Sequence, residues 1–295
     1  MSIKRTMSKL NHAKITPYRS GQRGAANHGW LDTKHTFNFA SYHSGPDSFG
    51  SLRVLNEDRV APNSGFPTHP HRDFEIFSYI LSGELTHRDS MLKKGAEGKG
   101  GKDDFYRMHR GDVQFTTGGR GIAHSEQNED SNNWVHFLQI WAVPWARGLT
   151  PRYHTQTFDE EAKRQAFVKI LSPLKAGPGA SEEQETQAAP AIPNTIPIHA
   201  DFVMGAGLLG VDKRFKWTVG GADEGDVTTK KQGRRVYVHV PMTKGGNAKV
   251  RLDGRESAVL GEGDGAFVEN VNAGDILGVE SVGEAEAEVV ILDSD

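Results

Sequence analysis

The chain has 295 residues, enough for one large domain or two ordinary ones. Hydrophobic residues make up 36% and charged residues 25%, which is typical of a folded globular protein and excludes a disordered one. The formal net charge of −3 gives no electrostatic case for direct nucleic-acid binding, and the lack of cysteine excludes disulfides, thiolate metal ligands and cysteine catalysis.

The N-terminal segment, residues 1–24, is basic and has no apolar run, so we do not expect a secretory signal there. No apolar stretch of the sequence is long enough to span a membrane. Secreted proteins of this size often carry disulfides, and this chain has no cysteine. We therefore expect an intracellular protein, in the cytoplasm or also in the nucleus, and a monomer by default.

Short alternating apolar segments follow in the first half, separated by glycine, proline and aspartate turns. They predict strands at residues 74–81 (FEIFSYIL), 112–117 (DVQFTT) and 134–141 (WVHFLQIW). Between the first two lies a polar insertion, Lys93 to Asp104, with no apolar side chain larger than alanine. We expect this insertion to be an exposed hairpin loop.

One segment after the first half has a helical pattern. In TFDEEAKRQAF, Thr157 and Glu160 have the spacing of a capping box, which predicts a helix that starts there. Residues 172–198 are rich in Pro, Ala, Gly and Glu and have few large apolar side chains. They predict a linker or long loop between two β-rich parts, at residues 1–171 and 199–295.

The second half again alternates. Strands are predicted at residues 235–240 (RVYVHV), 248–252 (AKVRL) and 287–292 (AEVVIL). Both halves carry a Gly-Asp turn before a strand, at Gly111-Asp112 and at Gly263-Asp264. Many short strands with turns at matching places predict an all-β chain of two duplicated barrels with a minor helix.

Eleven of the 13 histidines lie at or before His154, so histidine chemistry is expected in the first half. His69 and His71 are two apart around Pro70, a spacing that puts both on one face of a strand. Because proline cannot donate a ladder hydrogen bond, this pair should open a strand or lie at an edge. His124 and Glu126, just after a glycine-rich turn, are likewise two apart.

Two neighbouring strands would thus supply three imidazoles and one carboxylate. This donor set suits a divalent transition metal such as Fe(II), Mn(II), Ni(II), Cu(II) or Zn(II). The alternative is that a His-x-His pair arises by chance and has no function. Two pairs of potential ligands, each with its members two residues apart, favour the metal site. Four further histidines of the first half are expected to be structural or exposed: His87, His109, His136 and His154. Of these, His136 is expected to be a hydrogen-bonded core residue.

The stretches FPTHPHRDFEIFSYILSGELTHRDSM and RGDVQFTTGGRGIAHSE resemble the N-terminal half of the pirin family. The tail from QGRRVYVHV onward is similar to the second barrel of the bacterial quercetinase-type branch. The resemblance implies a bicupin whose first barrel alone binds metal, most readily Fe(II), with Cu, Mn, Ni, Co and Zn as alternatives. It also implies that His69, His71, His124 and Glu126 are the ligands. The general cupin pattern would instead use Glu75, which stays the alternative.

The same resemblance implies a quercetin 2,3-dioxygenase-like enzyme that takes a small aromatic, flavonol-like substrate and O₂. Glu126 would then be the catalytic base as well as a metal ligand. The alternative that the resemblance leaves open is a cofactor of transcription regulators, in which the redox state of the metal controls binding of a protein partner. The sequence itself does not show the substrate.

Overall fold

The computed structural model describes residues 10–38, 45–90, 105–221 and 230–295. These residues form two compact units. We call the unit of residues 21–159 and 173–200 the first barrel, and the unit of residues 1–20, 160–172 and 201–295 the second barrel. The predicted loop at Lys93 to Asp104 lies outside the described residues.

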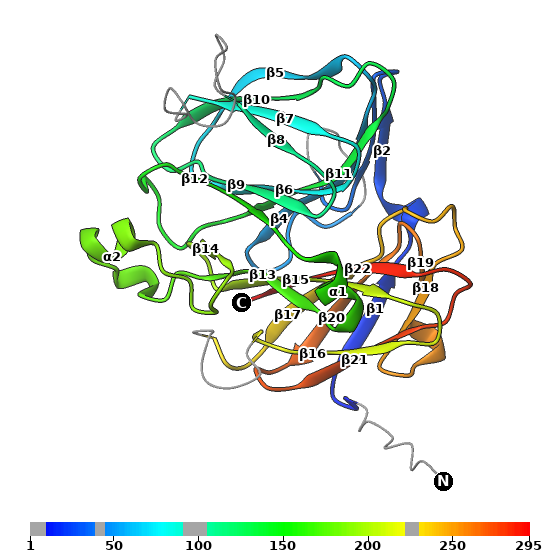
Figure 1. The fold of residues 1–295 in the computed structure, drawn as a ribbon. Helices are drawn as coiled ribbons and strands as arrows, with labels where there is room; N and C mark the ends of the chain where they lie inside the picture. The colour runs from blue at the N-terminus through cyan, green and yellow to red at the C-terminus, as the bar shows by residue number, and fades with distance from the viewer. Residues whose placement is uncertain (1–9, 39–44, 91–104, 222–229) are drawn as a thin grey trace. The chain divides into compact units, whose positions relative to one another are not determined.

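The first barrel consists of two antiparallel sheets, with strand orders β12-β9-β6-β11-β4-β3-β2 and β5-β10-β7-β8 (Figure 1). Its elements are β2 (Gly24–Asn27), β3 (Leu31–His35), β4 (Leu52–Val60), β5 (Ser64–His71), β6 (Glu75–Ser82), β7 (Leu85–Asp89), β8 (Tyr106–Met108), β9 (Asp112–Thr117), β10 (Ile122–Asn128), β11 (Val135–Ala142), β12 (Arg152–Thr157), the 3₁₀ turn η2 (Gly177–Gly179), α2 (Glu182–Gln187) and β14 (Ile196–Ile198).

The second barrel is built on two sheets with strand orders β1-β20-β17-β22-β15-β13-β14 and β16-β21-β18-β19, the first of which ends on β14. Its elements are β1 (Lys14–Tyr18), α1 (Glu160–Gln165), β13 (Val168–Pro173), β15 (Phe202–Leu209), β16 (Arg214–Thr218), β17 (Arg234–His239), β18 (Lys249–Leu252), the 3₁₀ turn η3 (Glu256–Ala258), β19 (Val259–Gly261), β20 (Gly265–Val271), β21 (Ile276–Ser281) and β22 (Ala287–Ser294); η1 (Ser20–Gln22) lies at the boundary. The prediction of an all-β chain with two barrels and minor helix is confirmed.

All six predicted strands are present, as β6, β9, β11, β17, β18 and β22, with bounds that differ by two residues or fewer. Seven of the eight residues of β6 are buried, which is why its sequence is nearly continuous in apolar side chains.

The interior of the first barrel changes from apolar to polar along β6. In the register between β6 and β11, Ile80 pairs with Phe137, and Ser78 pairs with Gln139. Ile80 and Phe137 belong to a buried apolar cluster, whereas Ser78 Oγ lies 3.1 Å from Gln139 Oε1. Because residues two apart share a face, a polar layer follows directly on the apolar one inside this barrel.

The two units differ from the predicted boundaries in three segments. Residues 160–172 pack with the second barrel, β1 pairs with β20 of the second barrel, and residues 173–200 pack with the first barrel. The last segment was predicted to be a linker, yet it holds α2 and β14. Its polar composition reflects surface elements and not a lack of structure, because Ser181 and Gln184 form a capping box that starts α2.

The capping box predicted at Thr157 is wrong. Thr157 is the last residue of β12, and its hydroxyl donates to Asp112 Oδ1 at 2.6 Å. The helix α1 does follow, at Glu160–Gln165. The Thr-x-x-Glu spacing was correct for a cap, but the pairing of β12 with β9 places Thr157 opposite Asp112 and engages its hydroxyl.

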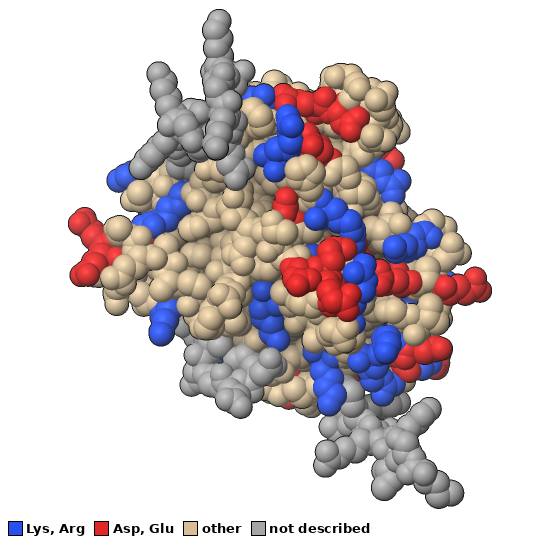
Figure 2. Space-filling model, in the orientation of Figure 1, with Lys and Arg blue, Asp and Glu red and all other residues tan. Residues whose placement is uncertain are grey.

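Lysine, arginine, aspartate and glutamate side chains are interspersed on the face shown in Figure 2, in line with the small net charge. No helix in the described ranges has the length and apolar character needed to cross a membrane.

Candidate metal centre

Strands β5 and β10 bring the three predicted histidines together. His124 pairs directly opposite His69, and His71 is two residues further along β5. The centroids of the rings form a nearly equal-sided triangle, with 4.6 Å between His69 and His71, 4.7 Å between His69 and His124, and 4.6 Å between His71 and His124. As the proline predicts, β5 is an edge strand, but the pair closes this strand and does not open it.

Two glycines set this geometry. Gly119 has a φ of +40° in the turn before β10, and a Cβ there would collide with the Leu149 carbonyl. At Gly65 a Cβ would collide with the Glu126 carbonyl, beside the irregularity in the β5–β10 ladder between His124 and Glu126. Only glycine therefore allows β5 and β10 to approach in this register.

The ring nitrogens fit a metal ion. The Nδ1 of His69 donates to the Pro67 carbonyl at 2.7 Å, which leaves Nε2 as an acceptor. The Nε2 of His71 and both ring nitrogens of His124 are buried and have no hydrogen-bond partner among the described residues. A buried polar atom without a partner costs about 1–3 kcal/mol, and a bound ion would remove that cost.

Burial also sets the protonation state. It lowers the pKa of His71 to about 4, with the neighbouring His69 adding to the effect. Burial, with His87 next in importance, lowers the pKa of His124 to about 2. Both rings are therefore neutral at pH 7, which is the form of histidine that binds metals.

Glu126 lies on β10 two residues after His124, in the polar layer of the barrel. Its Oε1 accepts from the Ser78 hydroxyl at 3.0 Å and its Oε2 from Gln139 Nε2 at 2.9 Å. Among the described residues, Glu126 is not part of either cluster whose donor atoms all lie within 4.8 Å of one another. Each carboxylate oxygen keeps a further acceptor site, so the role of ligand stays a prediction for Glu126.

The alternative carboxylate, Glu75, belongs to a different network. Its Oε2 accepts from the Thr117 hydroxyl at 3.0 Å, and its Oε1 lies 3.2 Å from His199 Nδ1. The other nitrogen of His199 lies 2.9 Å from Glu185 Oε2. Burial raises the pKa of Glu75. Burial acts to lower the pKa of His199, but the carboxylates of Glu75 and Glu185 have the larger effect and raise it.

Sequence reasoning missed His87 and Asp89. His87 was expected to be structural or exposed; it is fully buried on β7, and its ring lies 4.8 Å from that of His124. Asp89 pairs directly opposite His124. The signal was present, since His87 and Asp89 are two apart like His69 and His71. The predictions for His109, which is exposed, and for His136, which hydrogen-bonds Glu57 at 3.0 Å, are confirmed.

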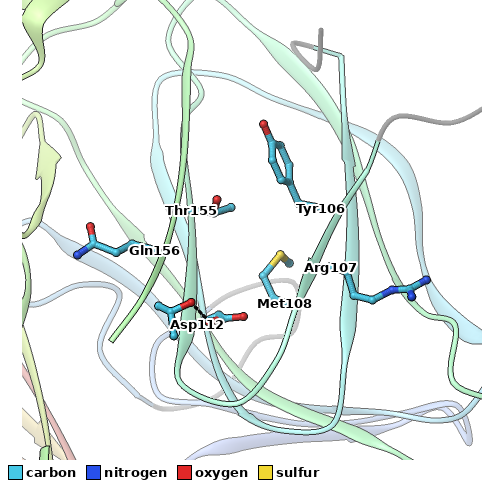
Figure 3. Close-up of a pocket in the computed structure, with 7 residues that line it drawn as sticks. Tyr106, Arg107, Met108, Asp112, Thr155 and Gln156 are labelled. Atoms are coloured by element: carbon cyan, nitrogen blue, oxygen red, sulfur yellow. Dashed lines mark hydrogen bonds between the residues drawn. The ribbon is translucent and has the colours of Figure 1, made fainter. Parts of the chain in front are cut away.

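A stack of aromatic rings leads from this cluster toward a cavity. The ring of Tyr153 lies 5.0 Å from that of His87, and the ring of Tyr106 lies 4.5 Å from that of Tyr153. Tyr106 lines a cavity of about 310 Å³ with Met108, Asp112 and Thr155 (Figure 3). No predicted metal ligand lines this cavity.

The comparisons with known proteins agree with the geometry. A family model described as Pirin matches residues 18–142. A protein named quercetin 2,3-dioxygenase from Escherichia coli (strain K12) is 42% identical over 157 residues, which are 52% of this chain and 62% of that relative. The match therefore spans less than two thirds of that relative.

Two further relatives cover nearly the whole chain. The putative quercetin 2,3-dioxygenase ZMO1337 of Zymomonas mobilis is 33% identical over 277 residues, which are 93% of this chain and 96% of that protein. The solved structure of the bacterial pirin YhhW from Escherichia coli in complex with nickel(II) is 29% identical, with a TM-score of 0.71, and covers 95% of this chain and 99% of that one.

Proposed function

The chain belongs to the pirin family, and from this premise we propose that it is a metal-dependent dioxygenase that cleaves a flavonol such as quercetin with O₂. Relatives named quercetin 2,3-dioxygenase support the substrate class. The observation that carries the proposal is the triangle of three imidazoles, two of which, His71 and His124, have buried nitrogens that lack a partner in the described part of the chain.

His69, His71, His124 and Glu126 are the residues that would hold the ion. Three imidazoles and one carboxylate suit Fe(II), and equally Mn, Co, Ni, Cu or Zn. The solved structure of the bacterial pirin YhhW is a complex with nickel(II), which supports a transition metal as the ion. A bound divalent ion supplies Lewis acidity, which lowers the pKa of a hydroxyl group that binds to it.

Glu126 is the residue that would take the proton of the flavonol hydroxyl. Its two oxygens are held by Ser78 and Gln139, so the carboxylate is oriented before the substrate arrives. Each of its oxygens accepts one hydrogen bond from these residues and keeps capacity for another, which allows Glu126 to receive a proton within hydrogen-bond reach.

Apolar and aromatic groups beside the site would restrict water. Trp141 presents its ring to His71 at 4.9 Å and 87°, and the cluster of Ile80 and Phe137 fills the barrel beyond the polar layer. A dry environment strengthens the hydrogen bonds that hold Glu126. The flat rings of a flavonol match such a lining.

The test is quercetin consumption in air. The protein is stripped with a chelator, loaded in turn with Fe(II), Mn(II), Co(II), Ni(II), Cu(II) and Zn(II), and assayed for loss of flavonol absorbance and release of carbon monoxide. We expect turnover with at least one metal, its loss in His71→Ala, and its retention in the control His109→Ala, whose side chain is exposed. No turnover in any sample with verified metal content would contradict the proposal.

A further inference from the structure

We propose that His87, Asp89 and His124 form a second position for a divalent metal ion inside the first barrel. This inference goes beyond the dioxygenase function and does not depend on it. It rests on the packing of β7 against β10, the same pairing that places His87 and Asp89 beside a ring that the first site also uses.

The donors have the spacing of a metal site. His87 and Asp89 are two apart on β7, and in the register with β10 Asp89 pairs with His124 and His87 pairs with Glu126. One donor atom from each of His87, Asp89 and His124 lies within 4.8 Å of the others, and His87 Nε2 is 3.5 Å from Asp89 Oδ2. Two donors bound at 2.0–2.1 Å to one tetrahedral ion lie about 3.3 Å apart.

His87 has no other evident role for its polar atoms. Its side chain is fully buried, and neither ring nitrogen has a hydrogen-bond partner within the described ranges. The ring is held in its plane by Tyr153, which stacks on it at 28°. A buried imidazole with both nitrogens unpaired is unfavourable, and an apolar side chain would fill the same space without that cost. An ion between His87 and Asp89 would bind the lone pair of His87 Nε2, the nitrogen that lies 3.5 Å from Asp89 Oδ2.

The donor set selects the class of ion. Two imidazoles and one carboxylate suit Fe(II), Mn(II), Co(II), Ni(II) and Zn(II), whereas Mg²⁺ prefers oxygen ligands. His124 takes part in both positions. Its ring lies 4.6 to 4.8 Å from those of His71, His69 and His87, and both of its nitrogens lack a partner in the described part of the chain.

The test removes two ligands of the first metal position and measures whether the protein still binds metal. His69→Ala/His71→Ala is dialysed against Co(II) or Zn(II), and bound metal is measured per chain, with circular dichroism as the check of folding. We expect about one equivalent to remain and to be lost when His87→Ala or Asp89→Asn is added. The added control substitution His109→Ala should leave the bound metal unchanged. A folded His69→Ala/His71→Ala protein that binds no metal would overturn the proposal.

A second measurement covers the case in which the double variant does not fold. Crystals of the wild-type protein are soaked in Zn(II), and anomalous difference density is recorded at the zinc edge. A peak within bonding distance of His87 and Asp89 supports the second position. Density confined to the side of His69 and His71 overturns it.

Discussion

Burial and the neighbouring rings lower the pKa of His71 and of His124, so both rings are neutral at pH 7. Each ring that joins the cluster disfavours a positive charge on its neighbours, which adds to the cost of burying charge. The folded chain therefore buries ring nitrogens of His71 and His124 that have no hydrogen-bond partner among the described residues, and it bears the free-energy cost of leaving them unpaired. Such a cost is typical of a site that is completed by a ligand.

The choice between the two carboxylates can be tested by metal affinity. Glu126→Ala is expected to weaken metal binding at least tenfold, on the order of the loss seen when a group that supports a metal site is removed. Glu75→Ala is expected to leave affinity unchanged, because Glu75 is engaged by Thr117 and His199. Isothermal titration calorimetry of both variants with the metal ion compares their affinities with that of the wild type. Loss of affinity in Glu75→Ala alone would reverse the assignment.

Asp58 predicts a dependence of stability on pH. Burial raises its pKa to about 7, although the Thr33 hydroxyl donates to it. The folded protein then keeps a proton that the unfolded chain loses near pH 3.8, so the free energy of unfolding falls as pH rises from about 4 to 7. The slope is at most about 1.4 kcal/mol per pH unit.

Asp58→Asn should flatten this slope, because the amide oxygen still accepts from Thr33 and does not ionise. Urea denaturation at several pH values between 4 and 8 measures it. The control is Asp32→Asn. Asp32 precedes Thr33 on β3, and its half-buried side chain points to the opposite face of that strand, so this variant should keep the wild-type slope. Parallel curves for wild type and Asp58→Asn would show that Asp58 is ionised in the folded protein.

At the scale of elements, β10 organises the site. It pairs with β5 on one side and with β7 on the other, so its residue His124 faces the donors of both neighbours. Parity along single strands predicted His69, His71, His124 and Glu126 as a group, and the structure brings the three histidines together, whereas Glu126 as a ligand stays a prediction. Parity did not identify His87 and Asp89, because nothing in the local sequence shows that β7 lies beside β10.

The segment of residues 173–200 shows the same limit. Its composition predicts a linker, but a buried charge network holds it, with Glu185 of α2 on one side of His199 and Glu75 of β6 on the other. Such a contact between residues more than 100 positions apart has no local signature. The apolar face of β14, buried at all three residues, is too short to stand out.

His199→Ala is expected to destabilise the protein by about 3–5 kcal/mol, because it leaves the Glu75 carboxylate buried without its cationic partner. Urea denaturation at pH 7 measures the change. Adding Glu75→Gln should recover part of the loss, since the buried charge is then removed. The exposed control Glu182→Ala on α2 should have little effect. A His199→Ala protein as stable as wild type would contradict this account of the network.

At the scale of the whole molecule, the two barrels have the same strand order. The order β12-β9-β6-β11-β4-β3-β2 corresponds to β1-β20-β17-β22-β15-β13-β14, and β5-β10-β7-β8 corresponds to β16-β21-β18-β19. The two Gly-Asp turns precede β9 and β20, which occupy equivalent places. The duplication inferred from these turns is thus visible in the topology.

The second barrel is built differently inside. The strands equivalent to β5 and β10 pair Phe215 with Val279 and Trp217 with Leu277, all buried and without metal-binding groups. Trp217 donates to Asp293 at 2.9 Å. The described clusters of metal-binding side chains all lie in the first barrel. Histidine content alone predicted this difference, whereas the exchange of segments at residues 160–172 and 173–200 depends on long-range packing that composition does not reveal.

We propose that metal binding in the first barrel depends on the ring of His124. The most direct measurement is the metal content of purified His124→Ala after dialysis against Fe(II), Ni(II) or Zn(II), beside wild type and the exposed control His109→Ala. We predict that wild type and the control bind metal and that folded His124→Ala binds none, because both clusters lose a shared donor. Wild-type metal content in His124→Ala would contradict the account.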